Sequence, residues 1–140
     1  MSEAVKEVPK RARPEFRNIH VTELKNYRLP PSGIVSILHR ISGFGMFLML
    51  PFLLYLFQLS LLSEYSYARF SGVLENPFVK LIVLGLSWAY LHHFCAGVRH
   101  LFMDNHLALD KDGSRKTAKI VLAVSLVLTA LVGLKLFGVF

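Results

Sequence analysis

Two adjacent histidines lie within an apolar stretch of the chain, where an ionisable side chain is unusual. His92 and His93 belong to the segment from about Phe78 to Val98. Taking Arg99 as the membrane boundary, His93 lies about six residues, or roughly 9 Å, deeper in a helix. Ionisable groups at such depth are rare, and they commonly mark ligand, proton or cofactor sites. The histidine pair is therefore a candidate binding site.

Helical spacing places the two histidines on different faces of one helix. His93 shares a stripe with small and polar residues: Gly85, Ala89, Ala96, Gly97, His100 and Asp104. Small neighbours leave a recess beside an imidazole, as a planar macrocycle requires. His92 shares its side with Trp88, Cys95 and Arg99, which is more crowded.

Two interpretations of His93 stay open at this point. Imidazole is a common haem ligand, so His93 could be an axial ligand of a haem iron. Alternatively, His93 is hydrogen-bonded to a neighbouring helix, and the small residues serve only helix packing. A six-coordinate haem needs a second ligand, and no other span offers a histidine at suitable depth. A haem bound here is therefore expected to be shared with another subunit.

A second polar group precedes the first apolar block. Ser36, Arg40 and Gly43 share a face at i, i+4 and i+7, with His39 alongside. A hydroxyl and a guanidinium suit a ligand carbonyl or carboxylate at the membrane edge. The simpler interpretation makes Arg40 a topological anchor and Ser36 a first-turn residue. Arg99 and Asp104 are likewise interpreted as interfacial charges at the end of their helix.

Three apolar blocks must position these residues. The chain has 140 residues, of which 54% are hydrophobic, and soluble domains have about 45–50%. Each block is long enough to cross a hydrocarbon core of about 30 Å. The predicted fold is an all-α membrane protein with a tail, residues 1–31, and an anchor domain, residues 32–140. The predicted helices cover residues of about 32–62, 77–104 and 114–139.

Local signals set the expected helix boundaries. Ser32 is expected to cap the first helix, and Pro51 is expected to kink it. Asn76 followed by Pro77 is a typical start for the second helix. The sequence Asp112-Gly113-Ser114 precedes the third helix.

Charge predicts the orientation of the spans. Eight Lys and Arg residues precede the first apolar block, and five lie between the second and third. The first-to-second connection has only Arg69 and Lys80, offset by Glu64 and Glu75. The positive-inside rule therefore predicts a cytoplasmic amino terminus. Lipid headgroups, rather than nucleic acid, are the expected partner of the net charge of +7.

Other cofactor and targeting signals are few. The single cysteine, Cys95, excludes an intrachain disulfide, a c-type haem attachment motif and a cysteine-rich zinc site. The first twenty residues contain no apolar run but include Glu3, Glu7 and Glu15. Acids are scarce in mitochondrial transit peptides, so the start favours a bacterial protein of the inner membrane.

Two strings resemble the family of succinate dehydrogenase cytochrome b556 subunits, the larger membrane anchors of respiratory complex II. The first is Ser36-Ile37-Leu38-His39-Arg40-Ile41-Ser42-Gly43, and the second runs from His93 through Gly97, Arg99 and His100 to Asp104. Arg13-Pro14 and Tyr27-Arg28-Leu29-Pro30 are also similar to that family. The resemblance covers roughly residues 13–140.

The resemblance implies roles for five residues. His93 matches the family's axial ligand of haem b, whose second ligand comes from the smaller anchor subunit. Ser36 and Arg40 match residues that contact the ubiquinone headgroup. His39 and Arg40 match the side of the haem propionates, and Asp104 matches a carboxylate near the quinone site.

The resemblance also implies partners. The chain is expected to form a heterodimeric helical bundle with the second anchor subunit, and to receive electrons from succinate through a flavoprotein and an iron–sulfur subunit. By itself such an anchor is not an enzyme. The competing interpretation is a cofactor-free membrane anchor or assembly subunit of another complex. A small channel is less consistent with the sequence, because the outer halves of the spans are almost wholly apolar.

Overall fold

The computed structural model describes residues 20–139, and all of its regular structure within that range is helical. The elements are the 3₁₀ helix η1 (Val21–Asn26), α1 (Pro31–Leu62), α2 (Glu64–Glu75), α3 (Pro77–Asp104) and α4 (Lys111–Leu136). Three of them, α1, α3 and α4, are long and apolar enough to cross a membrane. The prediction of an all-α protein with three spans is therefore confirmed. The acidic residues of the amino terminus and Arg13-Pro14 lie outside the described residues.

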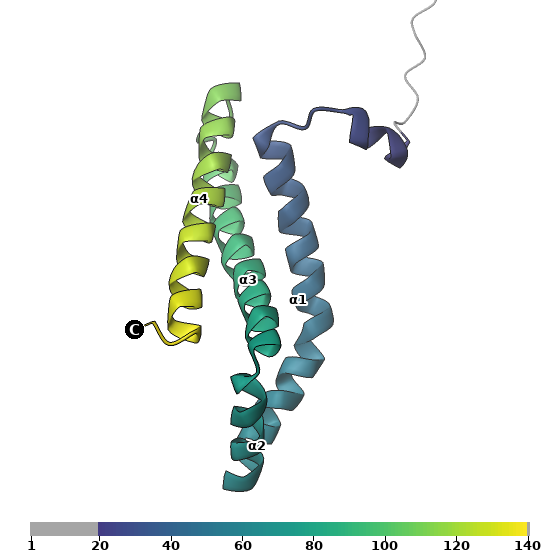
Figure 1. The fold of residues 1–140 in the computed structure, drawn as a ribbon. Coiled ribbons are helices and arrows are strands. Elements are labelled where there is room, and N and C mark those ends of the chain that lie inside the picture. Colours follow the sequence, from purple (N-terminus) through teal and green to yellow (C-terminus); the bar gives the residue numbers. More distant parts are fainter. Residues whose placement is uncertain (1–19, 140) are drawn as a thin grey trace, which may run out of the picture.

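The three long helices form an antiparallel bundle with α3 between α1 and α4 (Figure 1). The start of α1, the end of α3 and the start of α4 lie at one end of the bundle, and α2 lies at the other. We call the first of these the basic end, because Arg40, Arg99, Arg115, Lys116 and Lys119 belong to its helix turns.

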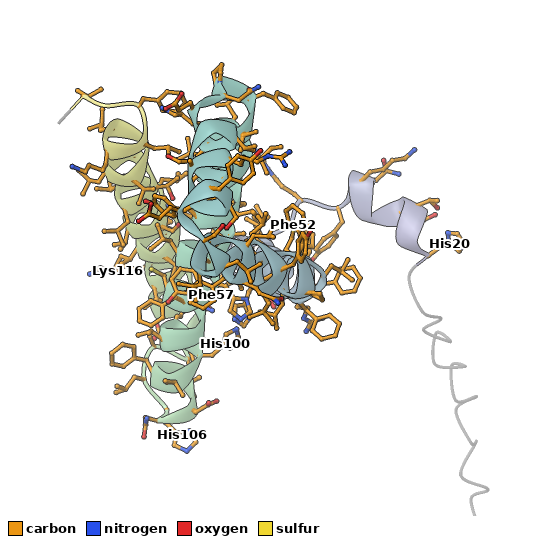
Figure 2. All side chains as sticks on the ribbon, turned by 90° about the horizontal axis from the view of Figure 1, so that it is seen from below. His20, Phe52, Phe57, His100, His106 and Lys116 are labelled. Carbon is orange, nitrogen blue, oxygen red and sulfur yellow. The ribbon has the colours of Figure 1, made fainter. Side chains whose placement is uncertain are left out.

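The shared core is small and lies near the basic end. Val35 of α1 packs with Ala96 of α3 and with Ala118 and Val121 of α4. Small side chains at such contacts let helix backbones approach closely, which drives packing where lipid is the solvent. Elsewhere large apolar side chains project outward, including Phe52 and Phe57 on α1 (Figure 2). The bundle therefore offers broad apolar faces to lipid or to another subunit.

The first helix begins one residue earlier than expected. Pro30 occupies the cap position, and no side chain caps the helix, so the expectation that Ser32 caps it was wrong. The carbonyl of Pro30 accepts from the N–H groups of Gly33 and Ile34 at 2.9 and 3.1 Å. Pro31 already has the fixed φ of a first helical residue, which places Ser32 inside the first turn. The helix continues through Pro51, and Figure 1 shows α1 changing direction in its second half.

The other two spans begin at side-chain caps. The Asn76 carbonyl oxygen accepts from the N–H of Phe78 at 2.9 Å, as the sequence predicted for the start of α3. The last span begins at Lys111 rather than near Ser114. There the Asp110 carboxylate accepts from the N–H of Gly113 at 2.9 Å. A Cβ at Gly113 would lie 2.5 Å from the other carboxylate oxygen, so this cap requires glycine.

The sequence did not predict α2. Its first turn is closed by a capping box, in which the Ser63 hydroxyl accepts from the Ser66 N–H at 3.2 Å. The Ser66 hydroxyl in turn accepts from the Ser63 N–H at 3.1 Å. Because Ser66 stands where this motif usually has Glu or Gln, its usual sequence signature is missing.

Candidate functional site

His93 is held against the backbone of α1. Its Nδ1 lies 3.0 Å from the backbone oxygen of His39 and 3.3 Å from the Ser42 hydroxyl. The ring covers Gly43 so closely that a Cβ at that residue would lie 2.7 Å from His93 Cε1. The hydrogen bond to α1 and this glycine contact together fix the position of the ring between α1 and α3.

The hydrogen bond to His39 also fixes which ring nitrogen carries the proton. A backbone carbonyl can only accept, so Nδ1 of His93 donates, and in the neutral imidazole Nε2 then keeps its lone pair. Nε2 forms no hydrogen bond with residues 20–139 and is not among their fully covered polar atoms. Metal-binding histidines commonly donate their other ring N–H to a carbonyl in this way. Nε2 of His93 is therefore chemically ready to bind a metal.

Ser42 also forms a hydrogen bond with the backbone carbonyl of His39. The sequence did not identify Ser42 as a site residue. Its side chain is only 5% exposed. Its hydroxyl donates to the His39 oxygen at 3.0 Å, so that oxygen accepts from both Ser42 and His93. The signals in the sequence are that Ser42 lies three residues after His39 and belongs to the string from Ser36 to Gly43.

Three imidazoles gather beside this contact. The His39 ring stacks on His93 with centroids 4.1 Å apart and planes 19° apart. His100 (labelled in Figure 2) lies one turn beyond Gly97. Its ring centroid is 5.1 Å from that of His39. A Cβ at Gly97 would lie 3.9 Å from His39 Nε2, so this glycine faces His39.

The small residues near His93 do not form one continuous recess. Ala96 is fully buried in the three-helix core, whereas a Cβ added at Gly85 would meet nothing within 4 Å. Gly97 admits the His39 ring of α1. The residues of the expected stripe thus have different roles. Ala96 serves helix packing, whereas Gly97 leaves room for an imidazole.

His92 has a different environment from His93. It is 0% exposed, and its ring stacks on Trp88 with centroids 5.3 Å apart. Neither ring nitrogen of His92 forms a hydrogen bond within the described part of the chain, although the Val35 backbone lies nearby. Its side of α3 is crowded, as the sequence predicted, and offers no opening for a large cofactor.

The predicted quinone residues lie at the basic end. Ser36 is half-buried, and Arg40 is exposed one turn further along α1. Neither side chain forms a hydrogen bond or ion pair with another described residue, so both remain available to a ligand. Asp104 is exposed as the last residue of α3. The structure thus brings His39, His93 and His100 together, and Asp104 forms no hydrogen bond or ion pair with any of the three.

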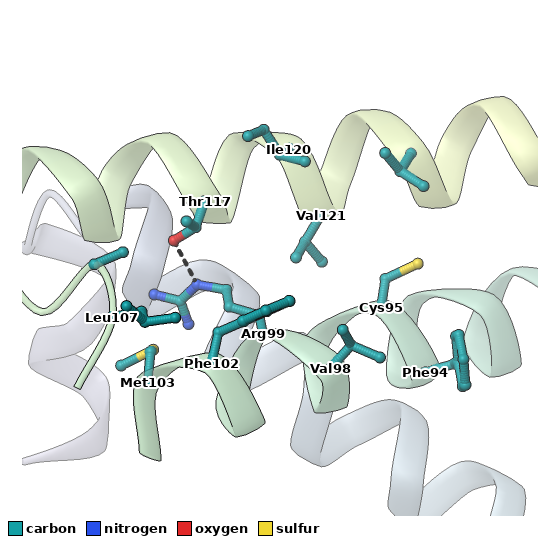
Figure 3. Close-up of a pocket in the computed structure, with 12 residues that line it drawn as sticks. Phe94, Cys95, Val98, Arg99, Phe102, Met103, Leu107, Thr117, Ile120 and Val121 are labelled. Carbon is teal, nitrogen blue, oxygen red and sulfur yellow. Dashed lines mark hydrogen bonds between the residues drawn. The ribbon is translucent and has the colours of Figure 1, made fainter. Parts of the chain in front are cut away.

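Arg99 is buried between helices rather than exposed as a charge at the end of its helix. It is only 5% exposed and lies between α3 and α4. Its Nε donates to the Thr117 hydroxyl at 3.0 Å (Figure 3). Its Nη2 donates to the Ser114 hydroxyl at 3.0 Å. These two hydroxyls, three residues apart on α4, draw the guanidinium into the helix interface.

Residues 14–132 match the family described as succinate dehydrogenase/fumarate reductase transmembrane subunit. A succinate dehydrogenase cytochrome b556 subunit from Coxiella burnetii is 37% identical over 79% of this chain and 90% of the relative. The subunits of that name from Paracoccus denitrificans and Rickettsia felis are 32% and 31% identical, each over 77% of this chain.

The family match extends over α1, α3 and most of α4, and over both strings that carried the resemblance. The relatives are of bacterial origin, and the family is one of transmembrane subunits. The chain therefore belongs to the succinate dehydrogenase/fumarate reductase transmembrane subunit family and is a multi-pass membrane subunit of the cytochrome b556 type.

Proposed function

We propose that the chain is a membrane anchor of a succinate:quinone oxidoreductase and supplies one axial ligand, His93 Nε2, to a shared b-type haem. The observation that carries this proposal is the hydrogen bond from His93 Nδ1 to the His39 carbonyl. It leaves Nε2 as an acceptor, and Gly43 provides the close approach that the ring needs. The relatives carry the name cytochrome b556, which agrees with this type of haem.

The neighbouring residues fit the same group. His39 and Arg40 belong to the turn of α1 that carries the carbonyl partner of His93, and we assign them to the propionate side. Histidine and arginine donors suit carboxylates. The second axial ligand comes from the smaller anchor subunit. When bound, a b-type haem supplies one-electron transfer, and this chain contributes the orientation and basicity of His93.

The quinone site is assigned to Ser36 and Arg40. Ser36 presents a hydroxyl and Arg40 a guanidinium on one face of α1, and neither is used within residues 20–139. Donors placed before the reaction stabilise negative charge as it develops on a carbonyl oxygen. The two side chains would therefore hold and polarise the carbonyls of ubiquinone. Asp104 is proposed to lie near this site.

Replacing Arg40 with leucine should lower quinone reduction by about tenfold to hundredfold, because a charged donor at the developing oxyanion is lost. Arg40 is exposed, so assembly of the complex should change much less. The measurement is succinate:quinone reductase turnover per assembled complex, with Arg69→Leu on the distant α2 as a control. Normal turnover in an intact Arg40→Leu complex would remove the quinone role.

The basic end is proposed to face the cytoplasm, with the amino terminus on the same side. The start of α1, the end of α3 and the start of α4 lie at this one end, and they carry the exposed Arg40, Lys111, Arg115, Lys116 and Lys119. At the other end, α2 has one basic residue, Arg69, and two acids, Glu64 and Glu75. This asymmetry favours the cytoplasmic side of the inner membrane for the basic end. The iron–sulfur subunit, which receives electrons from the flavoprotein, would dock there beside the quinone site.

A cofactor-free anchor remains the competing function. The specific observation in its favour is that the same small residues also serve helix packing, as Ala96 does. The two functions predict different visible absorbance spectra. A reduced-minus-oxidised spectrum of the complex, purified with its partners, shows a low-spin b-type signal if the chain shares a haem and none if it does not.

Replacing Ser42 with alanine should weaken haem binding by about tenfold, at the low end of the effect of outer-sphere partners. The substitution removes one of two donors on the His39 carbonyl but leaves the hydrogen bond from His93. Ser60→Ala is the matched control, because the Ser60 hydroxyl makes an equivalent bond to Phe57 at the far end of α1. Haem content per complex under haem-limited expression gives the comparison. Equal haem loss in both variants would contradict a specific role for Ser42.

A further inference from the structure

The Arg99 guanidinium is a buried cation that lacks a carboxylate partner among residues 20–139. Its side chain is 5% exposed, and its hydrogen-bond acceptors are all neutral oxygens of Thr117 and Ser114. Burying an uncompensated charge is costly, and a counter-ion reduces that cost. The remaining nitrogen, Nη1, forms no hydrogen bond within those residues and is not fully covered. An anion from outside the described chain would therefore stabilise Arg99.

An apolar cleft opens directly beside Arg99. It lies between α3 and α4 and has a volume of about 450 Å³ (Figure 3). Apart from Arg99 and Thr117, its walls are almost wholly apolar, and its main side chains are Phe94, Val98, Phe102, Ile120 and Val124. The site thus combines one buried cation with a hydrocarbon-like channel.

The size of the cleft favours a flexible chain over a protein helix. A helix about 10 Å in diameter would fill 450 Å³ with about one turn of its length. An acyl chain is much thinner and can follow an irregular apolar wall. The occupant that best matches the cleft is therefore lipid-like.

Exposed cations lie at the basic end, close in sequence to the α4 residues that line the cleft, and they outnumber the exposed Asp110 and Asp112 there. The first turns of α4 carry Lys111, Arg115, Lys116 and Lys119, and all four side chains are exposed. Figure 2 shows Lys116 projecting outward from this helix. Such clusters attract the anionic headgroups of the cytoplasmic leaflet. Charge therefore favours an anionic headgroup over a zwitterionic one.

We propose that the α3–α4 cleft binds an anionic phospholipid, with one acyl chain in the cleft and its phosphate beside Arg99. The lipid supplies the missing counter-ion and fills the apolar space between the two helices. This site lies on the α4 side of α3, whereas the imidazole cluster faces α1. The proposal requires only that the chain spans a membrane, so it stands or falls independently of the haem and quinone assignments.

The test uses the full complex, stripped of lipid in detergent and titrated with phosphatidylglycerol or phosphatidylcholine carrying the same acyl chains. Native mass spectrometry gives the dissociation constant of the first bound lipid. We expect phosphatidylglycerol to bind about fivefold or more tightly than phosphatidylcholine. Arg99→Gln should remove this preference, and Arg69→Gln on α2 should retain it.

A second pair of variants tests the position of the acyl chain. This test also applies if the Arg99→Gln complex fails to assemble. Ile120 lines the cleft and is half-exposed, so Ile120→Trp fills the cleft without entering the three-helix core. We expect it to weaken binding of both lipids, whereas Leu131→Trp, elsewhere on α4, should not. Equal binding of the two lipids by the unaltered complex would overturn the proposal, as would unchanged binding by Ile120→Trp. Equal binding of the two lipids would instead point to a carboxylate of a partner subunit as the counter-ion of Arg99.

Discussion

Replacing Gly43 with alanine should remove most of the b-type haem from the complex. The added Cβ would lie 2.7 Å from His93 Cε1, closer than real Cβ atoms come to other atoms. The ring must therefore shift, and a shift weakens its hydrogen bond to the His39 carbonyl, because both contacts are made to the same stretch of α1. We expect haem content to fall at least about tenfold, as for loss of an outer-sphere support.

The matched control for this substitution is Gly45→Ala, two residues further along α1. A Cβ at Gly45 would meet nothing within 4 Å. Both substitutions replace glycine by a better helix former, so neither should weaken α1 itself. Haem per complex, measured from the reduced-minus-oxidised spectrum, should therefore fall in the Gly43 variant alone. Normal haem in Gly43→Ala would show that His93 does not need its observed position.

Replacing His93 with tyrosine should abolish the low-spin b-type spectrum or convert it to another form. Tyrosine lacks the Nε2 lone pair that the carbonyl-bound tautomer presents, and a phenolate gives haem iron a different ligand field. The visible spectrum of the purified complex, normalised to subunit content, is the measurement. Assembly should be followed separately, because a haem shared as proposed would also link the two anchor subunits.

His92→Gln is the companion variant for the same measurement. His92 is enclosed beside Trp88 on the other side of α3, with no opening for a macrocycle. We expect this variant to keep its low-spin spectrum, although the buried substitution is expected to lower the stability of the fold. If the His92 change alone removed the spectrum, the assignment of the axial ligand to His93 would be wrong.

The spans were predictable because lipid imposes a simple rule on sequence. A helix must remain apolar for about 20 residues to cross the hydrocarbon core, and α1, α3 and α4 all do so. The cap at Asn76 followed the usual pattern. The sequence did not predict α2, because its capping box has Ser66 where this motif usually has an acid. The start of α4 was missed because Asp112-Gly113-Ser114 suggested a break, whereas Asp110 caps the helix there.

The site was predictable only to the level of one helix face. Spacing within α3 separated His93 from His92 correctly, because the rotation between neighbouring residues is fixed. The partners of His93 are on α1, more than 50 residues away in sequence. Which carbonyl faces the ring depends on how the two helices rotate and slide against one another. Spacing within one helix contains no information about that, so Ser42 and the burial of Arg99 became visible only in the structure.

The central claim is that His93 binds iron through Nε2 while its Nδ1 donates to the His39 carbonyl. The most direct measurement is an experimental structure of the complex, purified with its partner subunits, at a resolution that defines the haem and its ligands. We predict continuous density from the iron to His93 Nε2, with a histidine of the second anchor subunit on the opposite face. Iron bound to His92 or His39, or a lipid tail against His93 Nε2, would contradict this account.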